Sequence, residues 1–350
     1  MVWETIREHQ QQVDMFRQSF GQGRMSHAYL FVGPDGIGKR LFARAMSQCL
    51  FCESHPGEDL LACGQCNSCK QFAAGTYPDF FQVGKPEGKA ELTIDVFLGP
   101  RERRGREGLC YELSLRPMAG NRKLAIIDDA DSMNEESGNA LLKTLEEPPQ
   151  NSMLILIAAN SESVLPTIRS RCQFVRFSPL SHENMVSILR DENMVTDEAE
   201  AINIAELSDG SISSASQLLD PEIRSVRDKI IAEVSAATFN PLSTSAAMIK
   251  SVEELGGNTG AQRQNAILLS RFLIEFYRQC LVSLASNEPS PSPAVVNFVK
   301  RFSTDSADDS EKIAEMIERT MHCEVQLNRV MPYPLCFESL CEALGRIQRG

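Results

Sequence analysis

The sequence predicts an α/β protein, with a largely parallel sheet followed by a small helical segment and a longer all-helical one. The apolar run 28–32 predicts a strand, residues 123–127 have the pattern of a buried strand, and the run 153–159 is long enough for a strand that is buried on both faces of a parallel sheet. The first run leads through the glycine-rich segment 33–39 into a helix-like stretch. From residue 221 onward only the three-to-four spacing of helices is visible.

Bulk composition favours an intracellular protein with protein partners. The 350 residues predict two or three domains, and a net charge of −12 disfavours a protein that coats nucleic acid by itself. No apolar run approaches the roughly 20 residues that span a bilayer, and the first residues lack a signal pattern. We therefore expect a cytoplasmic location without membrane contact. The eleven cysteines are then expected to be thiols or metal ligands.

The chain begins with a predicted helix that ends at glycine. Apolar residues recur at helical spacing through Val13, Phe16 and Phe20, and Gly21 gives the stop. Trp3, the only tryptophan, is expected either to line a base pocket or to anchor the core.

The segment Gly33 to Arg40 matches seven of the eight positions of a phosphate-binding loop, or P-loop. Gly33, Gly36 and Gly38 are predicted to shape a turn whose N–H groups face an anion, and Lys39 to reach its terminal phosphates. The eighth position normally carries a Ser or Thr whose hydroxyl binds Mg²⁺, and Arg40 cannot coordinate a cation. The sequence therefore predicts a site for ATP or phosphate that lacks a metal ligand. A vestigial loop that binds nothing is the alternative.

Four cysteines after the P-loop helix predict a structural zinc site. Cys52 is followed, after ten residues, by Cys63, Cys66 and Cys69. Four thiolates with two close spacings match tetrahedral Zn²⁺, and the small residues between them allow tight turns. Because all four ligands are protein atoms, the site is expected to be closed, without a position for a catalytic water. Cys49 competes with Cys52 for the fourth position.

Two acidic residues follow the buried run 123–127. In P-loop proteins such a strand delivers one carboxylate to Mg²⁺ and often a second, longer one to the attacking water. Asp128 fits the first role, whereas Asp129 stands where a glutamate usually reaches the water. Acids that only end a buried strand are the alternative interpretation.

Four further segments complete this region. Residues 78–83 and 173–177 are predicted strands, and residues 139–149 are predicted to form a short amphipathic helix that two prolines stop. Arg101 to Arg106 is the most basic run. It either contacts a phosphate backbone or, as the neighbouring acids favour, is a solvated loop.

These motifs together resemble the bacterial DNA polymerase III clamp-loader family of AAA+ proteins. The resemblance rests on residues 27–31, the P-loop, the cysteine cluster, residues 139–149 and Ser170-Arg171-Cys172, and it covers about the first 220 residues. It implies one arm of a five-subunit ring segment. That assembly opens the sliding clamp and loads it on primed DNA during replication.

The resemblance also implies a three-domain organisation. An AAA+ domain is expected over 1–178, with the zinc module at about 49–72. A small helical lid domain follows over 179–222, and an all-α collar for oligomerisation over 223–350.

Within this family, the departures from the motifs imply the delta-prime branch. Gamma/tau members hydrolyse ATP, whereas delta-prime supplies an arginine to a neighbour without hydrolysing ATP itself. Arg40 replaces the metal-binding hydroxyl, Asp129 replaces the usual glutamate, and Ser213 stands where hydrolysing relatives carry a phosphate-sensing arginine. The intact glycines and Lys39 leave weak binding of ATP or phosphate open.

The resemblance further implies that Arg171 is an arginine finger that acts in trans on a neighbour's ATP. The implied partners are gamma/tau and delta subunits, with the sliding clamp and primed DNA reached through the complex. The alternative for Arg171 is a surface arginine paired with an acid such as Glu162.

Two other functions compete with this interpretation. An ATP-hydrolysing gamma/tau-type subunit is opposed by Arg40, Asp129 and Ser213. An independent zinc-containing nucleic-acid binder is opposed by the acidic net charge and by the lack of an aromatic and basic stripe.

Overall fold

The computed structural model of the protein describes residues 2–55, 57–86, 89, 91–257, 259–286, 292–301, 306–329 and 331–349. The chain divides into two compact units, Met1–Ser214 and Ala215–Gly350. Among the described helices, none is long and apolar enough to cross a membrane.

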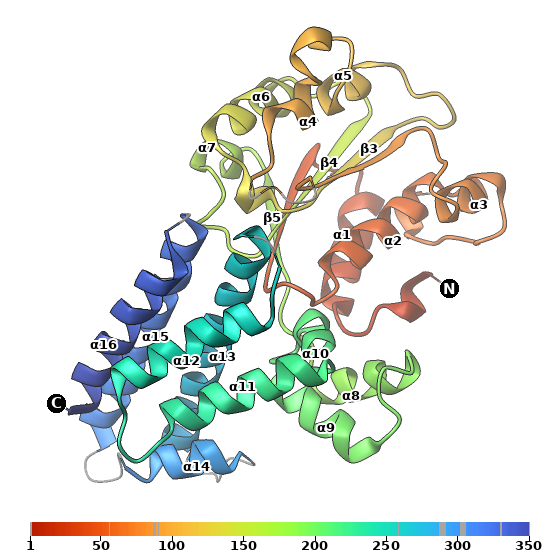
Figure 1. Ribbon diagram of the computed structural model, residues 1–350. Helices are drawn as coiled ribbons and strands as arrows, with labels where there is room; N and C mark the ends of the chain where they lie inside the picture. The colour runs from red at the N-terminus through yellow and green to blue at the C-terminus, as the bar shows by residue number, and fades with distance from the viewer. Residues whose placement is uncertain are drawn as a thin grey trace. The chain divides into compact units, whose positions relative to one another are not determined.

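The first unit is built on a five-stranded parallel sheet with the order β2-β3-β4-β1-β5 (Figure 1). The strands are β1 Ala28–Val32, β2 Phe80–Val83, β3 Lys123–Ile127, β4 Ser152–Ala158 and β5 Gln173–Arg176. All five predicted strands are present. The three apolar runs correspond to β1, β3 and β4, which are the central strands, and the prediction that 153–159 is buried on both faces is confirmed for β4.

Helices connect and cover these strands. They are α1 Gln10–Gly21, α2 Lys39–Phe51, α3 Asn67–Ala73, α4 Ile94–Leu98, α5 Leu109–Ser114, α6 Glu135–Glu146, α7 Pro166–Arg169, α8 His182–Asp191, α9 Glu198–Leu207 and α10 Ile212–Leu218. Short 3₁₀ turns lie at Val2–Thr5, Gly57–Asp59, Arg101–Arg103 and Ala130–Ser132. The last three helices, α8 to α10, follow β5 and correspond to the small helical segment that was predicted after the sheet.

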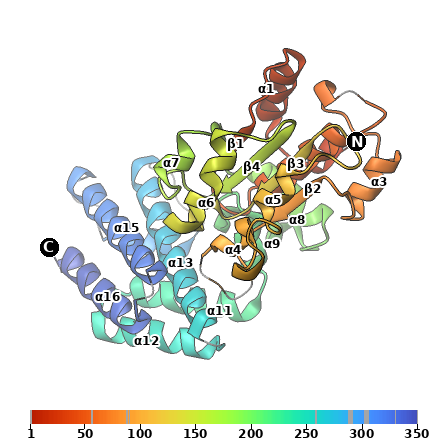
Figure 2. The same cartoon turned by 90° about the horizontal axis from the view of Figure 1, so that it is seen from above.

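Alternating side chains of the sheet feed two separate cores. Tyr29 and Phe31 point to the face covered by α1, α2 and α3, whereas Ala28 and Leu30 point to the face covered by α4, α5, α6 and α7. Figure 2 shows α3 and α6 on opposite sides of the strands. Period-two alternation in β1 therefore fixes both layers of the α/β sandwich.

The second unit is all-helical. Its helices are α11 Pro221–Val234, α12 Pro241–Glu254, α13 Thr259–Ser286, α14 Pro293–Val299, α15 Ser306–Asn328 and α16 Tyr333–Arg349. In it α13 packs along α15 and α12 along α16, around one core that contains Tyr277, Phe298 and Phe337. The prediction of an all-α C-terminal region is confirmed. The lid boundaries at 179 and 222, and a collar from 223 onward, stay predictions.

Candidate nucleotide and metal sites

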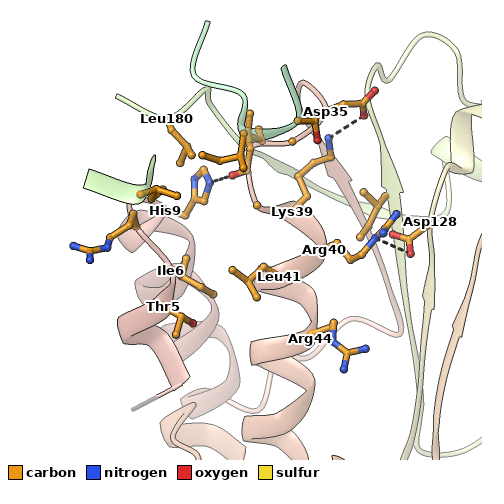
Figure 3. Close-up of a pocket in the computed structure, with 18 of the residues that line it drawn as sticks. Thr5, Ile6, His9, Asp35, Lys39, Arg40, Leu41, Arg44, Asp128 and Leu180 are labelled. Atoms are coloured by element: carbon orange, nitrogen blue, oxygen red, sulfur yellow. Dashed lines mark hydrogen bonds and ion pairs between the residues drawn. The ribbon is translucent and has the colours of Figure 1, made fainter. Parts of the chain in front are cut away.

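A cavity of about 720 Å³ lies at the carboxyl ends of the parallel strands in the first unit, which is where α/β sheets bind ligands. Its walls come from the N-terminal turn, the P-loop, the acidic end of β3 and helix α8 (Figure 3). The charged lining residues include Asp35, Lys39, Arg40, Arg44, Asp128, Asp129 and Asp131.

Two of the P-loop positions, Gly33 and Gly36, have no room for a side chain, and Gly36 also has a positive φ angle. Gly36 has a φ of 74°, and a Cβ there would lie 2.5 Å from the Ser211 hydroxyl oxygen. A Cβ at Gly33 would overlap the carbonyl oxygen of Phe177. Both positions therefore exclude other residues, because the Phe177 backbone and the Ser211 side chain approach the loop directly.

Five consecutive carbonyl groups of the P-loop accept hydrogen bonds. Lys39 Nζ donates to the carbonyls of Gly33 and Pro34, the latter at 2.6 Å. The carbonyls of residues 35, 36 and 37 accept from Ser211 Oγ at 2.8 Å, from the Ile212 amide at 2.9 Å and from His9 Nε2 at 2.8 Å. The N–H groups of residues 36–39 find no acceptor in the part of the chain that the structure describes. They stay available to an anion.

Lys39 is buried, with 5% of its side chain exposed, and lies 3.8 Å from Asp35 Oδ1. Burial lowers the pKa of its ammonium group, and the charges of Asp35, Asp131 and Asp128 partly oppose that shift. The lysine that the motif assigns to phosphates therefore also cross-links the loop. The sequence alone does not predict this contact of Lys39, nor the hydrogen bonds that His9 and Ser211 donate to the P-loop.

Arg40 and Asp128 form an ion pair across the position that the motif gives to Mg²⁺. Arg40 Nε lies 3.0 Å from Asp128 Oδ2, which also accepts a hydrogen bond of 2.9 Å from Gln82 Nε2. The other oxygen, Oδ1, is buried and has no hydrogen-bond partner among the described residues. A guanidinium thus neutralises the carboxylate that the motif would direct to the metal.

Two more acids lie beside this pair. Asp129 adopts a left-handed conformation with a φ of 54° at the start of a 3₁₀ turn. Burial raises the pKa of Asp131, whose Oδ2 accepts a hydrogen bond of 2.8 Å from the Ala159 amide. Sequence reasoning did not single out Asp131. With Asp35, these residues make the surroundings of Lys39 acidic, which disfavours a highly charged anion unless a cation accompanies it.

The structure brings together the four predicted metal ligands. The Sγ atoms of Cys52, Cys63, Cys66 and Cys69 all lie within 4.8 Å of one another. Tetrahedral zinc with bonds of about 2.3 Å places sulfur atoms about 3.8 Å apart, so the cluster fits with small adjustments. Backbone amides donate to the sulfurs, for example Cys66 N to Cys63 Sγ at 3.2 Å.

Hydrogen bonds within the cluster favour the thiolate form of Cys63. Donors around Cys63, first the Ser54 hydroxyl and then the Gln65 and Cys66 amides, lower the pKa of that thiol to about 5. Cys49, the competing ligand, lies outside the cluster and is fully buried in the core, and burial raises its pKa to about 12. The geometry therefore favours Cys52 as the fourth ligand.

Trp3 packs against the core beside α2 and is absent from the cavity lining. Its Nε1 donates to the Leu60 carbonyl at 2.7 Å, and its ring lies 5.1 Å from that of Phe42. The second of the two expectations for this residue is correct.

Arg171 follows the end of α7 and is absent from the cavity lining. Its Nη2 lies 2.6 Å from Glu146 Oε1, whereas Glu162 pairs with Arg169 at 2.9 Å. The ion pair of the alternative interpretation is therefore present, but its acid is Glu146 and not Glu162. Packing of α6 against α7 brings Glu146 closer.

The basic run is partly neutralised. Arg103 lies 2.7 Å from Glu107 and Arg104 lies 3.6 Å from Asp95, and all residues of 101–106 are exposed. These pairs favour the solvated-loop interpretation.

The known proteins to which this chain is similar in sequence are subunits of DNA polymerase III. The family described as "DNA polymerase III, delta subunit" matches residues 8–181. The delta-prime subunit of DNA polymerase III from Pseudomonas aeruginosa is 34% identical over 223 residues, which cover 62% of this chain and 63% of that protein. The tau subunit from Escherichia coli is 29% identical over 65% of this chain and 34% of its own length.

A solved structure also matches over most of the chain. It is a gamma-subunit-related protein from Thermotoga maritima, 14% identical, with a TM-score of 0.38 over 95% of this chain and 100% of that one. The chain spans less than two thirds of the length of the curated relatives above. On these sequence matches, the chain belongs to the family of DNA polymerase III delta-prime subunits, and it is also similar to a tau subunit.

Proposed function

We propose that this chain is a non-hydrolysing subunit of the clamp loader, which assembles with gamma/tau and delta subunits and helps to load the sliding clamp onto primed DNA. In this proposal it works in the cytoplasm, its own P-loop turns over no ATP, and Arg171 completes the ATP site of a neighbouring subunit.

The observation that carries the non-hydrolysing role is the Arg40–Asp128 ion pair. ATP hydrolysis in P-loop proteins needs a metal held by a Ser or Thr hydroxyl and a strand-end carboxylate. Here the hydroxyl is replaced by a guanidinium that lies 3.0 Å from that carboxylate. Asp129 has a shorter side chain than the usual glutamate, and Ser213 lines the cavity where a sensing arginine would be expected.

The trans role of Arg171 is supported by its placement. The guanidinium lies outside the chain's own cavity and is one third exposed, so it is accessible to another subunit. A guanidinium delivered from outside a phosphate pocket stabilises the charge of phosphoryl transfer, on the order of a thousandfold or more in related systems.

The four-cysteine cluster is proposed to hold one structural Zn²⁺. Its ligands come from the end of α2, the loop after it and the start of α3, so the metal would fasten two helix ends. All four positions are taken by thiols, which leaves no site for a catalytic water.

The all-α second unit is proposed as the oligomerisation collar. Three of its apolar side chains are about half exposed: Met321 and Val325, one turn apart on α15, and Leu335 on α16. Exposed apolar side chains one turn apart on a helix, such as Met321 and Val325, suit a protein interface.

The second candidate is a gamma/tau-type ATPase. It is favoured by the intact glycines, by Lys39 and by the similarity to a tau subunit. Hydrolysis by the isolated chain would support it.

The proposal is tested by reconstituting the complex with Arg171→Ala and measuring ATP hydrolysis in the presence of clamp and primed DNA. We expect normal assembly and a deficit in hydrolysis that appears only in the complex. Unchanged hydrolysis and clamp loading with a normally assembled variant would contradict the trans role.

A further inference from the structure

Arg171 is held between the ends of two helices. Its Nη2 donates to Glu146 Oε1 at 2.6 Å, at the last residue of α6. Its Nη1 donates to the Thr167 carbonyl at 2.9 Å and to Ser170 Oγ at 3.1 Å, at the end of α7. The side chain is thereby fixed from both sides.

These contacts leave part of the guanidinium available. The group carries five N–H donors, and the contacts above use only its two terminal nitrogens. Nε has no acceptor in the part of the chain that the structure describes, and 35% of the Arg171 side chain is exposed. An oriented guanidinium with free donors suits the recognition of a phosphate that arrives from outside.

The position of Glu146 is itself set by packing. Leu145, its neighbour on α6, and Ile168 on α7 belong to the same buried core. A Cβ at Gly138 would overlap the side chain of Leu165, so α6 and α7 are in close contact. The end of α6 is therefore held beside α7, which keeps the Glu146 carboxylate within reach of Arg171.

We infer that Glu146 is a positioning residue for the proposed arginine finger, which orders Arg171 before the neighbouring nucleotide engages it. This inference rests on the proposed trans role of Arg171. Because the pair is half exposed, its loss is expected to lower kcat of the neighbour's ATP hydrolysis by up to about fivefold. KM for ATP should not change, since the finger acts on the transition state.

The test uses the reconstituted complex with clamp and primed DNA, and compares Glu146→Gln, Arg171→Ala and the double variant. Glu162→Gln is the matched control, because it removes a similar ion pair, between Glu162, which precedes α7, and Arg169, its last residue, without touching Arg171. Glu146→Gln should lower kcat alone, should add nothing to Arg171→Ala, and should leave thermal stability and assembly as they are. Glu162→Gln should have no effect.

Each other outcome is decisive. If Arg171→Ala changes nothing, the proposed trans role itself fails. If Arg171→Ala is defective but Glu146→Gln behaves like the control, the positioning role is wrong. A further loss in the double variant would show that Glu146 acts independently of Arg171. A higher kcat in Glu146→Gln would make the carboxylate a restraint on the finger and would equally overturn the inference.

Discussion

The side chain at position 40 determines which group the Asp128 carboxylate binds, and here that group is the Arg40 guanidinium. The carboxylate already accepts from Gln82, and the Arg40 guanidinium takes the same oxygen. A hydroxyl at this position would be too short to form that pair and would add an oxygen ligand for Mg²⁺.

We therefore predict that Arg40→Thr makes nucleotide binding depend on Mg²⁺. The variant should bind ATP more tightly with Mg²⁺ than with a chelator, by a factor on the order of ten, or about 1.4 kcal/mol. Calorimetric titration under both conditions measures the difference. Arg40→Lys, which keeps a cation, should show little Mg²⁺ dependence, and equal affinities for Arg40→Thr would contradict the proposed role of the pair.

Asp131 gives a prediction of pH dependence. Burial raises its pKa, so the folded protein keeps the proton at pH values where the unfolded chain has lost it. The contribution of this group to stability therefore increases as the pH falls through the folded pKa toward 3.8, and is lost as the pH rises.

Asp131→Asn should accordingly raise the melting temperature at neutral pH, and this gain should shrink as the pH is lowered toward 4. Thermal unfolding of both proteins between pH 4 and 8 measures it. Asp14→Asn, at an exposed position on α1, should give no comparable trend. A gain that stays constant with pH would show that the charge of Asp131 is not its cause.

Among the elements, helices α2 and α3 depend on the cysteine cluster. Cys52 is the residue at the C-terminal cap of α2, and Cys66 caps the N-terminus of α3 through the Cys69 amide. A metal held there would join the two helix ends.

Protein purified without added zinc should therefore contain about one tightly bound zinc ion per chain. Cys66→Ser should lower this content, lower the melting temperature and increase hydrogen exchange over residues 52–73. It should neither create nor abolish an ATPase activity. Cys110→Ser, outside the cluster, is the control and should retain the metal. Metal-free native protein in which all thiols react freely would refute the zinc site.

The elements also show how far sequence reasoning reaches. The strands were predictable because strands buried in a parallel sheet are continuous apolar runs. Helices α4 and α5 were not, since five and six residues are too few to display a helical period.

Contacts between distant elements were the harder part of the site. Arg40 meets Asp128 because the P-loop follows β1 and Asp128 follows β3, with β4 between these strands. The residues of the motif were visible in the sequence, but their pairing depends on strand order. For the same reason, nearness in sequence suggested Glu162 for Arg171, whereas helix packing supplies Glu146.

At the scale of the whole molecule, the proposed collar implies that assembly with other subunits depends on the exposed apolar side chains of α15. Val325→Asp places a charge among exposed apolar residues of α15 and should weaken co-purification with the other clamp-loader subunits, while the monomer keeps its melting temperature. Ile202→Asp, the same kind of change at an exposed position on α9, should leave assembly intact. Normal assembly of the Val325 variant would exclude this face as the interface.

The most direct measurement is ATP hydrolysis by the isolated chain in the presence of Mg²⁺, beside Asp128→Ala. If Arg40 has taken the place of the metal ligand, turnover stays at background and Asp128→Ala does not change it. Measurable hydrolysis that Asp128→Ala abolishes would contradict the non-hydrolysing function and identify a gamma/tau-type ATPase.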